Sequence, residues 1–288
     1  MPNNDTPHRN RKWVLEQWTQ DVVVASWLRW HEKISVHQAQ LVHALLQNCG
    51  ATAGEQVLDL GCGPGAVALS LSETVGTDGE VVTTDISPGI VESLKDRAAA
   101  LDVENIDVVV AESEELPFDS EQFDLVTSLL TPMYFVTVSR SFAEIRRVLR
   151  GDGRGCLMAW GMPEQGDYFE TCVLPFLQRS NLDAPPPEAP SPFRFAPPGL
   201  MTGELVKAGF VDVTERRFVL PMSWPGSPEE LWRHLYETCV GFRPIFDSLS
   251  RDSFEEAYAE SMASLAGRYD GTSTVNSVEI VLGIGRKV

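Results

Sequence analysis

The sequence VLDLGCGPGAVALSL, residues 57–71, joins an apolar run to a cluster of glycines and then to a pattern typical of a helix. Asp59 lies within the apolar run, and Gly61, Gly63 and Gly65 follow it. Glycine allows a tight turn and lets the backbone touch a ligand, because it has no side chain. In a parallel α/β sheet such a turn lies at the carboxyl end of a strand, where small ligands bind. The stretch therefore predicts a ligand site in an α/β fold.

Short apolar runs alternate with helical patterns from this stretch onward. The apolar runs are QVLDL, EVVTTDI, IDVVVA, FDLVTSLL and GCLMAW. Their alternation with helical patterns predicts a parallel sheet. Two later runs, VDVTERRFVL and VNSVEIVLGIG, bring the expected number of strands to seven. The sequence thus predicts a doubly wound, Rossmann-like α/β fold.

Helical segments and a loop are expected around the predicted sheet. Residues 36–50 fit a helix that ends at Gly50, and the Trp-rich segment before it is a candidate helical cap. Residues 175–198 hold eight prolines, so we expect a loop there and neither a helix nor an inner strand. The later segments SPEELWRHLYETCV and SFEEAYAESMASLAGRY predict two further helices.

Composition and charge exclude several classes of protein. The chain has 288 residues, 43% of them hydrophobic, which is close to the globular average. Its formal charge of −18 repels the phosphates of nucleic acid, so we expect no nucleic-acid partner. No apolar run is long enough to span a membrane, and the first twelve residues, MPNNDTPHRNRK, lack the apolar region of a secretory signal, so we expect a cytoplasmic protein. No His, Cys or carboxylate group has the spacing of metal ligands, and no metal site is expected.

Polar side chains end the two strands that follow the glycine cluster. Asp85 ends EVVTTDI, where a doubly wound fold places a carboxylate for ribose hydroxyls. Glu112 and Ser113 follow the third strand and suit the polar edge of a base. Three neighbouring strand ends therefore predict a nucleoside site, and both NAD and an adenosyl ligand fit it.

Four ordered motifs resemble the class I S-adenosylmethionine-dependent methyltransferases, in particular the ubiquinone/menaquinone-biosynthesis branch. VLDLGCGPG resembles motif I, TTDIS motif II, AESEELPF the family's GDAENLPF-type segment, and FDLVTSLL the strand after it. The resemblance covers residues 35–160 strongly and PPGLMTGELVKAGFVDV more weakly. It implies S-adenosyl-L-methionine as the cofactor and a late antiparallel strand pair in the sheet. An NAD-dependent oxidoreductase, and a binder or cyclase that keeps the nucleoside site without methyl transfer, are the alternatives.

The resemblance also implies a role for each residue of the nucleoside site. Gly61, Gly63 and Gly65 would pass under the methionine part of the cofactor, and Asp59 would help to hold its amino end. Asp85 would bind both ribose hydroxyls, and Ile86 would pack on the adenine. The edge of the adenine would be bound by the side chain of Glu112 and the backbone of Ser113.

The resemblance and the element order together divide the chain into parts. The expected parts are a helical cap (1–50), a cofactor-binding Rossmann-like core (51–161), a segment with the acceptor-pocket loop, late core elements and a helical insertion (162–272), and a final core strand (273–288). The acceptor pocket is expected between the cap and residues 162–272, which supply the aromatic side chains Phe193, Phe195, Trp224, Trp232, Tyr236, Phe242 and Phe246.

Candidate catalytic residues are few. Many relatives carry a His-His pair where this chain has Met133 and Tyr134. A general base could instead be His31, His37 or His234, and Tyr134 could hydrogen-bond the acceptor. We expect O- or C-methylation of a small apolar or aromatic metabolite of quinone-like, phenolic or polyketide type. The acceptor, the methylated atom, the use of a base and the oligomeric state, including a homodimer, stay open.

Overall fold

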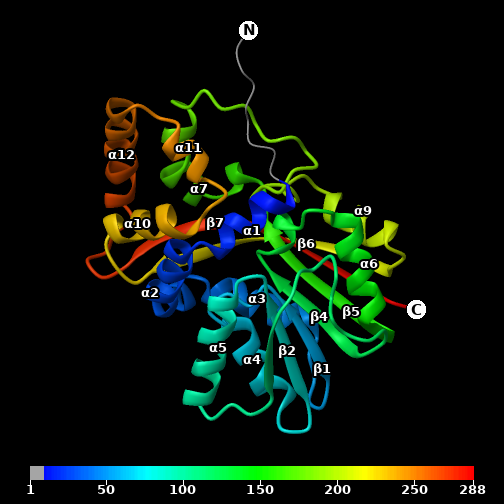
Figure 1. Ribbon diagram of the computed structural model, residues 1–288. Helices are drawn as coiled ribbons and strands as arrows, with labels where there is room; N and C mark the ends of the chain where they lie inside the picture. The colour runs from blue at the N-terminus through cyan, green and yellow to red at the C-terminus, as the bar shows by residue number, and fades with distance from the viewer. Residues whose placement is uncertain (1–9) are drawn as a thin grey trace.

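A single seven-stranded sheet forms the centre of the computed structural model, which describes residues 10–288 (Figure 1). The strand order is β3-β2-β1-β4-β5-β7-β6. The pairs from β3 to β5 are parallel, whereas β7 is antiparallel to both β5 and β6. This confirms the predicted mostly parallel sheet with a late antiparallel strand. The strands are β1 (Gln56–Leu60), β2 (Glu80–Asp85), β3 (Ile106–Val110), β4 (Phe123–Leu129), β5 (Leu149–Trp160), β6 (Val211–Trp224) and β7 (Thr274–Arg286).

Helices cover both faces of the sheet, as the alternating pattern predicts. In Figure 1, α3, α4 and α5 lie on one side of the sheet, and α6 and α9 lie on the other. Val57 and Leu58 of the central strand β1 are fully buried between these layers. Local signals set the helix ends: α5 begins with Pro88 after Ser87, and α3 ends at Gly50, whose φ is +64°. The helices are α3 (Ala39–Cys49), α4 (Ala66–Val75), α5 (Pro88–Ala100), α6 (Val138–Val148) and α9 (Leu200–Lys207).

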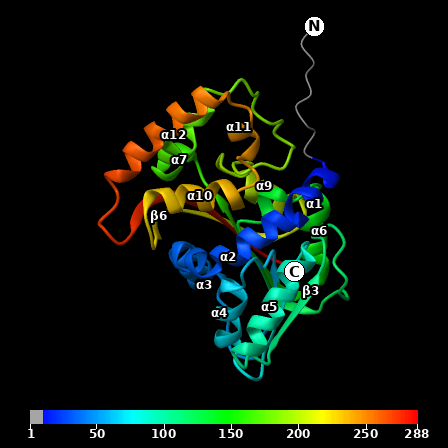
Figure 2. The ribbon, with the colours of Figure 1, turned by 60° about the vertical axis from the view of Figure 1, so that its left-hand side comes forward.

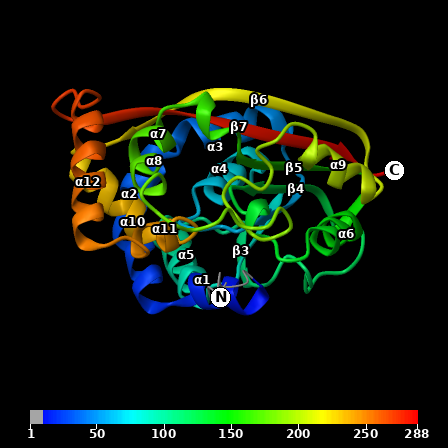
Figure 3. The ribbon, with the colours of Figure 1, turned by 90° about the horizontal axis from the view of Figure 1, so that it is seen from above.

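Two helices, α1 (Arg11–Thr19) and α2 (Asp21–His37), precede α3 within the segment 1–50 predicted as a helical cap, of which residues 1–9 lie outside the described residues. Helix α1 lies over the carboxyl ends of the parallel strands, and seen from above it is far from the long ribbons of β6 and β7 (Figures 1 and 3). The helix predicted over residues 36–50 is interrupted, because the chain turns at Gln38 between α2 and α3. No helix among residues 10–288 is long and apolar enough to cross a membrane.

Six helices from residues 163–266, which are those of this range other than α9, form a cluster at one end of the sheet (Figure 2). Its centre is aromatic: the ring of Phe176 stacks on Trp232 and meets Phe246 edge-on. The proline-rich stretch is a loop except at its start, where Pro175 lies in the first turn of α8, a position that needs no N–H donor. The elements are η2 (Pro163–Gln165), α7 (Tyr168–Cys172), α8 (Leu174–Leu177), α10 (Pro228–Thr238), α11 (Arg243–Asp247) and α12 (Arg251–Ala266).

Candidate active site

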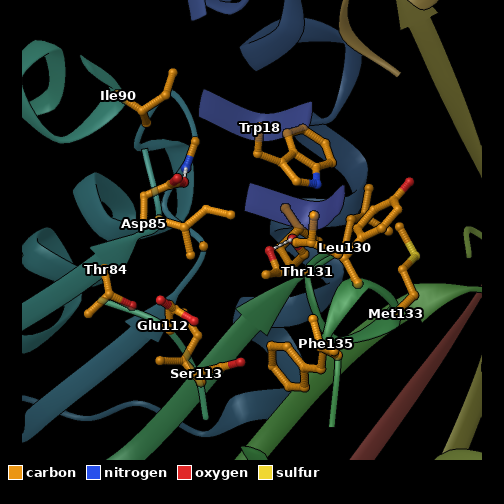
Figure 4. A pocket seen from close by; sticks show the side chains of 18 of the residues that line it. Trp18, Thr84, Asp85, Ile90, Glu112, Ser113, Leu130, Thr131, Met133 and Phe135 are labelled. Carbon is orange, nitrogen blue, oxygen red and sulfur yellow. Dashed lines mark hydrogen bonds between the residues drawn. The ribbon is translucent and has the colours of Figure 1, made fainter. Parts of the chain in front are cut away.

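One pocket opens at the carboxyl ends of β1, β2, β3 and β4, and its two sides differ in chemistry (Figure 4). With its open mouth it encloses about 1280 Å³. One side, the polar half, is built from the glycine turn and the ends of β2 and β3: Gly61, Gly63, Asp85, Ile86, Glu112 and Ser113. The other side, the apolar half, comes from α1, the end of β4 and the short helix η1 (Pro132–Tyr134): Trp18, Leu130, Thr131, Met133, Tyr134 and Phe135.

The glycine turn after β1 adopts backbone angles that favour glycine. Gly61, Gly63 and Gly65 have φ values of +80°, +46° and +89°. A Cβ on Gly61 would lie 2.0 Å from Oγ1 of Thr131, and one on Gly65 would lie 2.2 Å from Cδ1 of Leu94. A Cβ on Gly63 would meet nothing closer than 3.9 Å. Gly61 and Gly63 therefore expose bare backbone to the pocket, whereas Gly65 packs against α5 and does not line it.

Asp59 is buried beneath the glycine turn and does not line the pocket. Its carboxylate accepts hydrogen bonds from Oγ1 of Thr127 at 2.8 Å and Oγ1 of Thr83 at 3.2 Å. Both threonines lie directly opposite Asp59 on the neighbouring strands β4 and β2. Burial raises the pKa of Asp59 from 3.8 to about 6, although the two hydroxyls oppose the shift. Asp59 thus links three strands under the turn, and its role toward a cofactor's amino end stays a prediction.

Asp85 at the end of β2 lies at the junction between the glycine turn and the pocket. Its carboxylate accepts hydrogen bonds from the backbone N–H of Gly63 at 3.2 Å and of Ser87 at 3.0 Å. Burial raises its pKa, and these N–H donors oppose the rise. The same carboxylate lines the polar half. It can therefore hold the turn in place and accept hydrogen bonds from ligand hydroxyls.

Glu112 and Ser113 complete the polar half from the end of β3. The carboxylate of Glu112 faces the pocket and pairs with the guanidinium of Arg11 from α1. The hydroxyl of Ser113 lies 3.1 Å from that of Ser141 on α6. Asp85 and Glu112 are thus two carboxylates on one side of a hollow whose floor is bare backbone (Figure 4). This arrangement suits a ligand that carries hydroxyl and amine donors, as a nucleoside does.

The four candidate catalytic residues fall in different places. Tyr134 lines the apolar half, where its ring lies 5.2 Å from that of Trp18 in an edge-on contact. His31 lines a smaller cavity on the other side of Gly63, and its Nδ1 lies 2.8 Å from the carbonyl oxygen of Leu28. His37 and His234 are buried together and do not line the pocket, with ring centres 5.8 Å apart. The structure therefore brings only Tyr134 to the apolar half.

His37 and His234 belong to the protein core. The ring of His234 stacks on Trp224 at 4.5 Å, and His37 meets Trp224 edge-on. Burial lowers the pKa of His37 to about 3 and that of His234 well below its usual range. Both rings are therefore neutral at physiological pH and separated from the pocket. A general base must contact the acceptor, and this arrangement gives neither histidine such a contact.

The seven aromatic residues expected to build the acceptor pocket lie elsewhere. Most of them are buried in the core, and none lines the pocket found among residues 10–288. From residues 162–272, the pocket is lined instead by Thr238 and Cys239, at the end of α10. Aromatic composition correctly indicates a well-packed insertion but does not indicate which face of it meets the ligand. The residues are Phe193, Phe195, Trp224, Trp232, Tyr236, Phe242 and Phe246.

Comparison with known proteins decides the family. Residues 57–153 match the family model described as "Methyltransferase domain". The chain is 30% identical to nocamycin O-methyltransferase of Saccharothrix syringae, over 81% of this chain and 85% of that protein. The chain belongs to the class I S-adenosylmethionine-dependent methyltransferases. The cofactor of this family is S-adenosyl-L-methionine. The strand ends alone fitted both an adenosyl ligand and NAD, and the family decides for the adenosyl ligand.

Other relatives match the core of this chain. The 2-phytyl-1,4-naphtoquinone methyltransferase of Trichormus variabilis is 33% identical over 138 residues, which are 45% of this chain. The match spans only 60% of that relative's length. Among solved structures, the YcgJ protein of Bacillus subtilis has a TM-score of 0.57 at 19% identity, over 85% of this chain and 97% of that one. That likeness concerns the fold.

Several pocket residues were not predicted from the sequence, among them Leu130, Thr131 and Phe135, which line the apolar half. Trp18, which also lines it, belongs to the Trp-rich cap that was expected to help build the acceptor pocket. Leu130 has a φ of +56°, which is unusual for a residue with a bulky side chain and is typical of strained backbone at a functional site. It follows β4, the parallel neighbour of β1, so the rule that ligands bind at the carboxyl ends of strands could have found it. Residues 10–288 contain no cluster of three or more potential metal-ligating His, Cys, Asp or Glu side chains.

Proposed function

We propose that this protein transfers a methyl group from S-adenosyl-L-methionine to a small apolar or aromatic metabolite. One observation carries the proposal: the polar half and the apolar half belong to one continuous pocket (Figure 4). A donor bound over Gly63 and an acceptor held against Tyr134 and Met133 would therefore share one cavity. The formal charge of −18 supports a small acceptor over a nucleic acid.

The polar half would hold the cofactor. Asp85 would accept hydrogen bonds from the ribose hydroxyls, and Glu112 would accept one from the adenine amine. Ile86 would pack on the adenine ring, and the backbone of Ser113 would meet its edge. At Gly63, where an added Cβ would come no closer than 3.9 Å to another atom, the bare backbone would leave room for the methionine part. When bound, the cofactor would supply a methyl group on a sulfonium sulfur for in-line attack by an acceptor nucleophile, with S-adenosylhomocysteine as the leaving group.

The apolar half would hold and align the acceptor. Its aromatic and aliphatic side chains exclude water, which favours attack by an acceptor nucleophile over side reactions. The hydroxyl of Tyr134 would hydrogen-bond an acceptor oxygen and so orient it toward the methyl group. Quinone-like, phenolic and polyketide-type acceptors fit this lining, with methylation on oxygen or carbon. The names of the two relatives, a naphthoquinone methyltransferase and an O-methyltransferase, support the same range.

Incubation with donor labelled in its methyl group tests the function directly. A set of quinols, phenols and enolic polyketides is supplied as acceptors, and mass spectrometry detects the label. We expect transfer to at least one of them by the wild type and little transfer by Asp85→Asn. Tyr134→Phe should keep the affinity for S-adenosylhomocysteine and lower turnover. Binding of nicotinamide dinucleotide without binding of S-adenosylhomocysteine would contradict the proposal, and so would intact donor with every acceptor.

A further inference from the structure

One face of helix α1 forms part of the pocket wall. Arg11, Val14, Leu15 and Trp18 line the pocket. Their spacing of three, four and seven residues places them on one side of a helix. The face runs for about 10 Å, at 1.5 Å per residue. Because Arg11 reaches the polar half and Trp18 reaches the apolar half, α1 crosses both parts of the pocket.

Contacts at its two ends hold this helix over the pocket. At the first end, Nε of Arg11 donates to Oε2 of Glu112 at 2.7 Å and Nη2 donates to Oε1 at 2.5 Å. Such a bidentate pair fixes direction as well as distance. At the other end, the ring of Trp18 contacts those of Tyr134, at 5.2 Å, and Trp27, at 6.2 Å.

Helix α1 is short and is not continuous with α2. It has nine residues, and only Val14 among them is buried. A helix this short is marginal by itself in water. The chain between α1 and α2 is extended at Gln20, with φ −63° and ψ 131°, so no continuous helix ties α1 to α2. The end contacts therefore contribute to holding α1 over the pocket.

We propose that Arg11 is the latch of α1, and that its ion pair with Glu112 opens whenever the cofactor or its product enters or leaves. The inference rests on the proposed function, in which Glu112 binds the adenine amine. Glu112 would then accept hydrogen bonds from two donors, the guanidinium of Arg11 in the protein and the adenine amine of the ligand. Arg11 is a positioning residue here, because it acts through Glu112 and through the helix that carries it.

The latch has a kinetic consequence. While the pair is formed, α1 slows passage through the mouth in both directions, so loss of Arg11 should raise the association and the dissociation rate constants of S-adenosylhomocysteine. An exposed ion pair supports a change of roughly two- to fivefold. Salt should speed exchange in the wild type by screening the pair and should have less effect on Arg11→Ala. Arg11→Lys keeps the charge without the bidentate geometry and should give intermediate rates.

A neighbouring residue provides the matched control. Lys12 carries the same charge on the same helix and is 81% exposed in its side chain, and within residues 10–288 its ion pair is with Glu16 on its own helix. Lys12→Ala removes one positive charge without touching Glu112. Its exchange rates should equal those of the wild type.

Stopped-flow measurement of S-adenosylhomocysteine binding and displacement at low and high salt tests the latch. Faster association and dissociation in Arg11→Ala, intermediate rates in Arg11→Lys and unchanged rates in Lys12→Ala would support it. An unchanged rate constant in either direction for Arg11→Ala, or an equal change in Lys12→Ala, would overturn it. If the wild type does not bind S-adenosylhomocysteine at all, the proposed function itself fails, whereas normal binding with unaltered exchange in Arg11→Ala removes only the latch.

Discussion

The two halves of the pocket are built by different means. The polar half comes from the ends of three adjacent strands, and its members lie within residues 61–113. The apolar half gathers Trp18 from α1 and residues 130–135 from the other side of the central strand. Backbone geometry and two carboxylates define the first, whereas side-chain packing between distant segments defines the second. In the proposed function, the cofactor site is therefore fixed by the sheet, and the acceptor site can vary with the cap and the loops.

The largest effect is expected where the two halves touch, at Gly61. A Cβ there would lie 2.0 Å from Oγ1 of Thr131, and the substituted residue would also have to adopt a φ of +80°. Gly61→Ala should lower the free energy of unfolding by about 2 to 4 kcal/mol, from strain and overpacking together. Urea denaturation measures this loss.

Gly63→Ala is the matched variant, because its Cβ would make only an ordinary van der Waals contact, 3.9 Å from Cζ3 of Trp27. It should lose only about 1 to 2 kcal/mol of stability from backbone strain. Its affinity for S-adenosylhomocysteine should nevertheless fall at least about tenfold, because the added methyl group fills the floor of the polar half. Equal losses of stability in the two variants would show that the contact between Gly61 and Thr131 is not close.

The buried carboxylate of Asp59, beneath the glycine turn, makes the stability of the folded protein depend on pH. Its folded-state pKa of about 6 lies above the ordinary 3.8, so the folded protein binds this proton more tightly than the unfolded chain. The resulting stabilisation is complete below pH 3.8 and is lost as the pH rises through about 6. Relative to Asp59→Asn, the wild type should lose roughly 1 to 1.5 kcal/mol between pH 5 and pH 8.

Denaturation of both proteins across that pH range measures the difference. Because both carry the other titrating groups, their shared pH dependence cancels in the comparison. Parallel stability curves would contradict the raised pKa of Asp59.

A smaller effect should appear in the apolar half, between α1 and η1. The edge-on contact of Trp18 with Tyr134 predicts a coupling energy of about 0.5 to 1.5 kcal/mol in a double-mutant cycle with Trp18→Leu and Tyr134→Leu. Tyr134→Leu should leave the affinity for S-adenosylhomocysteine within about twofold of the wild type, because Tyr134 belongs to the acceptor side. Additive losses of stability would mean that α1 and η1 do not support each other.

The sequence predicts the sheet and the polar half because both follow local rules. Glycines after a strand predict a tight turn. Parallel strands bring their carboxyl ends to one edge of the sheet, so Asp85 and Glu112 are expected on the same side of the pocket. Asp59 is a partial exception: its carboxylate bonds to Thr83 and Thr127, and only the register of β1 between β2 and β4 reveals that.

The apolar half was less predictable because it depends on tertiary packing. Histidines were candidates for a general base, yet His37 ends α2 on its buried side and meets the rings of Trp224 and His234 edge-on. The sequence shows the tryptophans of the cap, but it does not show which side of their helix faces the pocket. The spacing of Val14, Leu15 and Trp18 could have indicated a pocket-facing stripe, but nothing local tells such a stripe from one that packs on the core.

The central claim is that Asp85 helps to hold an adenosyl group over the bare backbone at Gly63, in a half of the pocket separate from Tyr134. Calorimetric titration of S-adenosylhomocysteine into the wild type, Asp85→Asn and Tyr134→Phe tests it most directly. The account predicts roughly micromolar binding by the wild type and by Tyr134→Phe, and binding about tenfold weaker or more by Asp85→Asn. Equal affinity in the wild type and Asp85→Asn would contradict it.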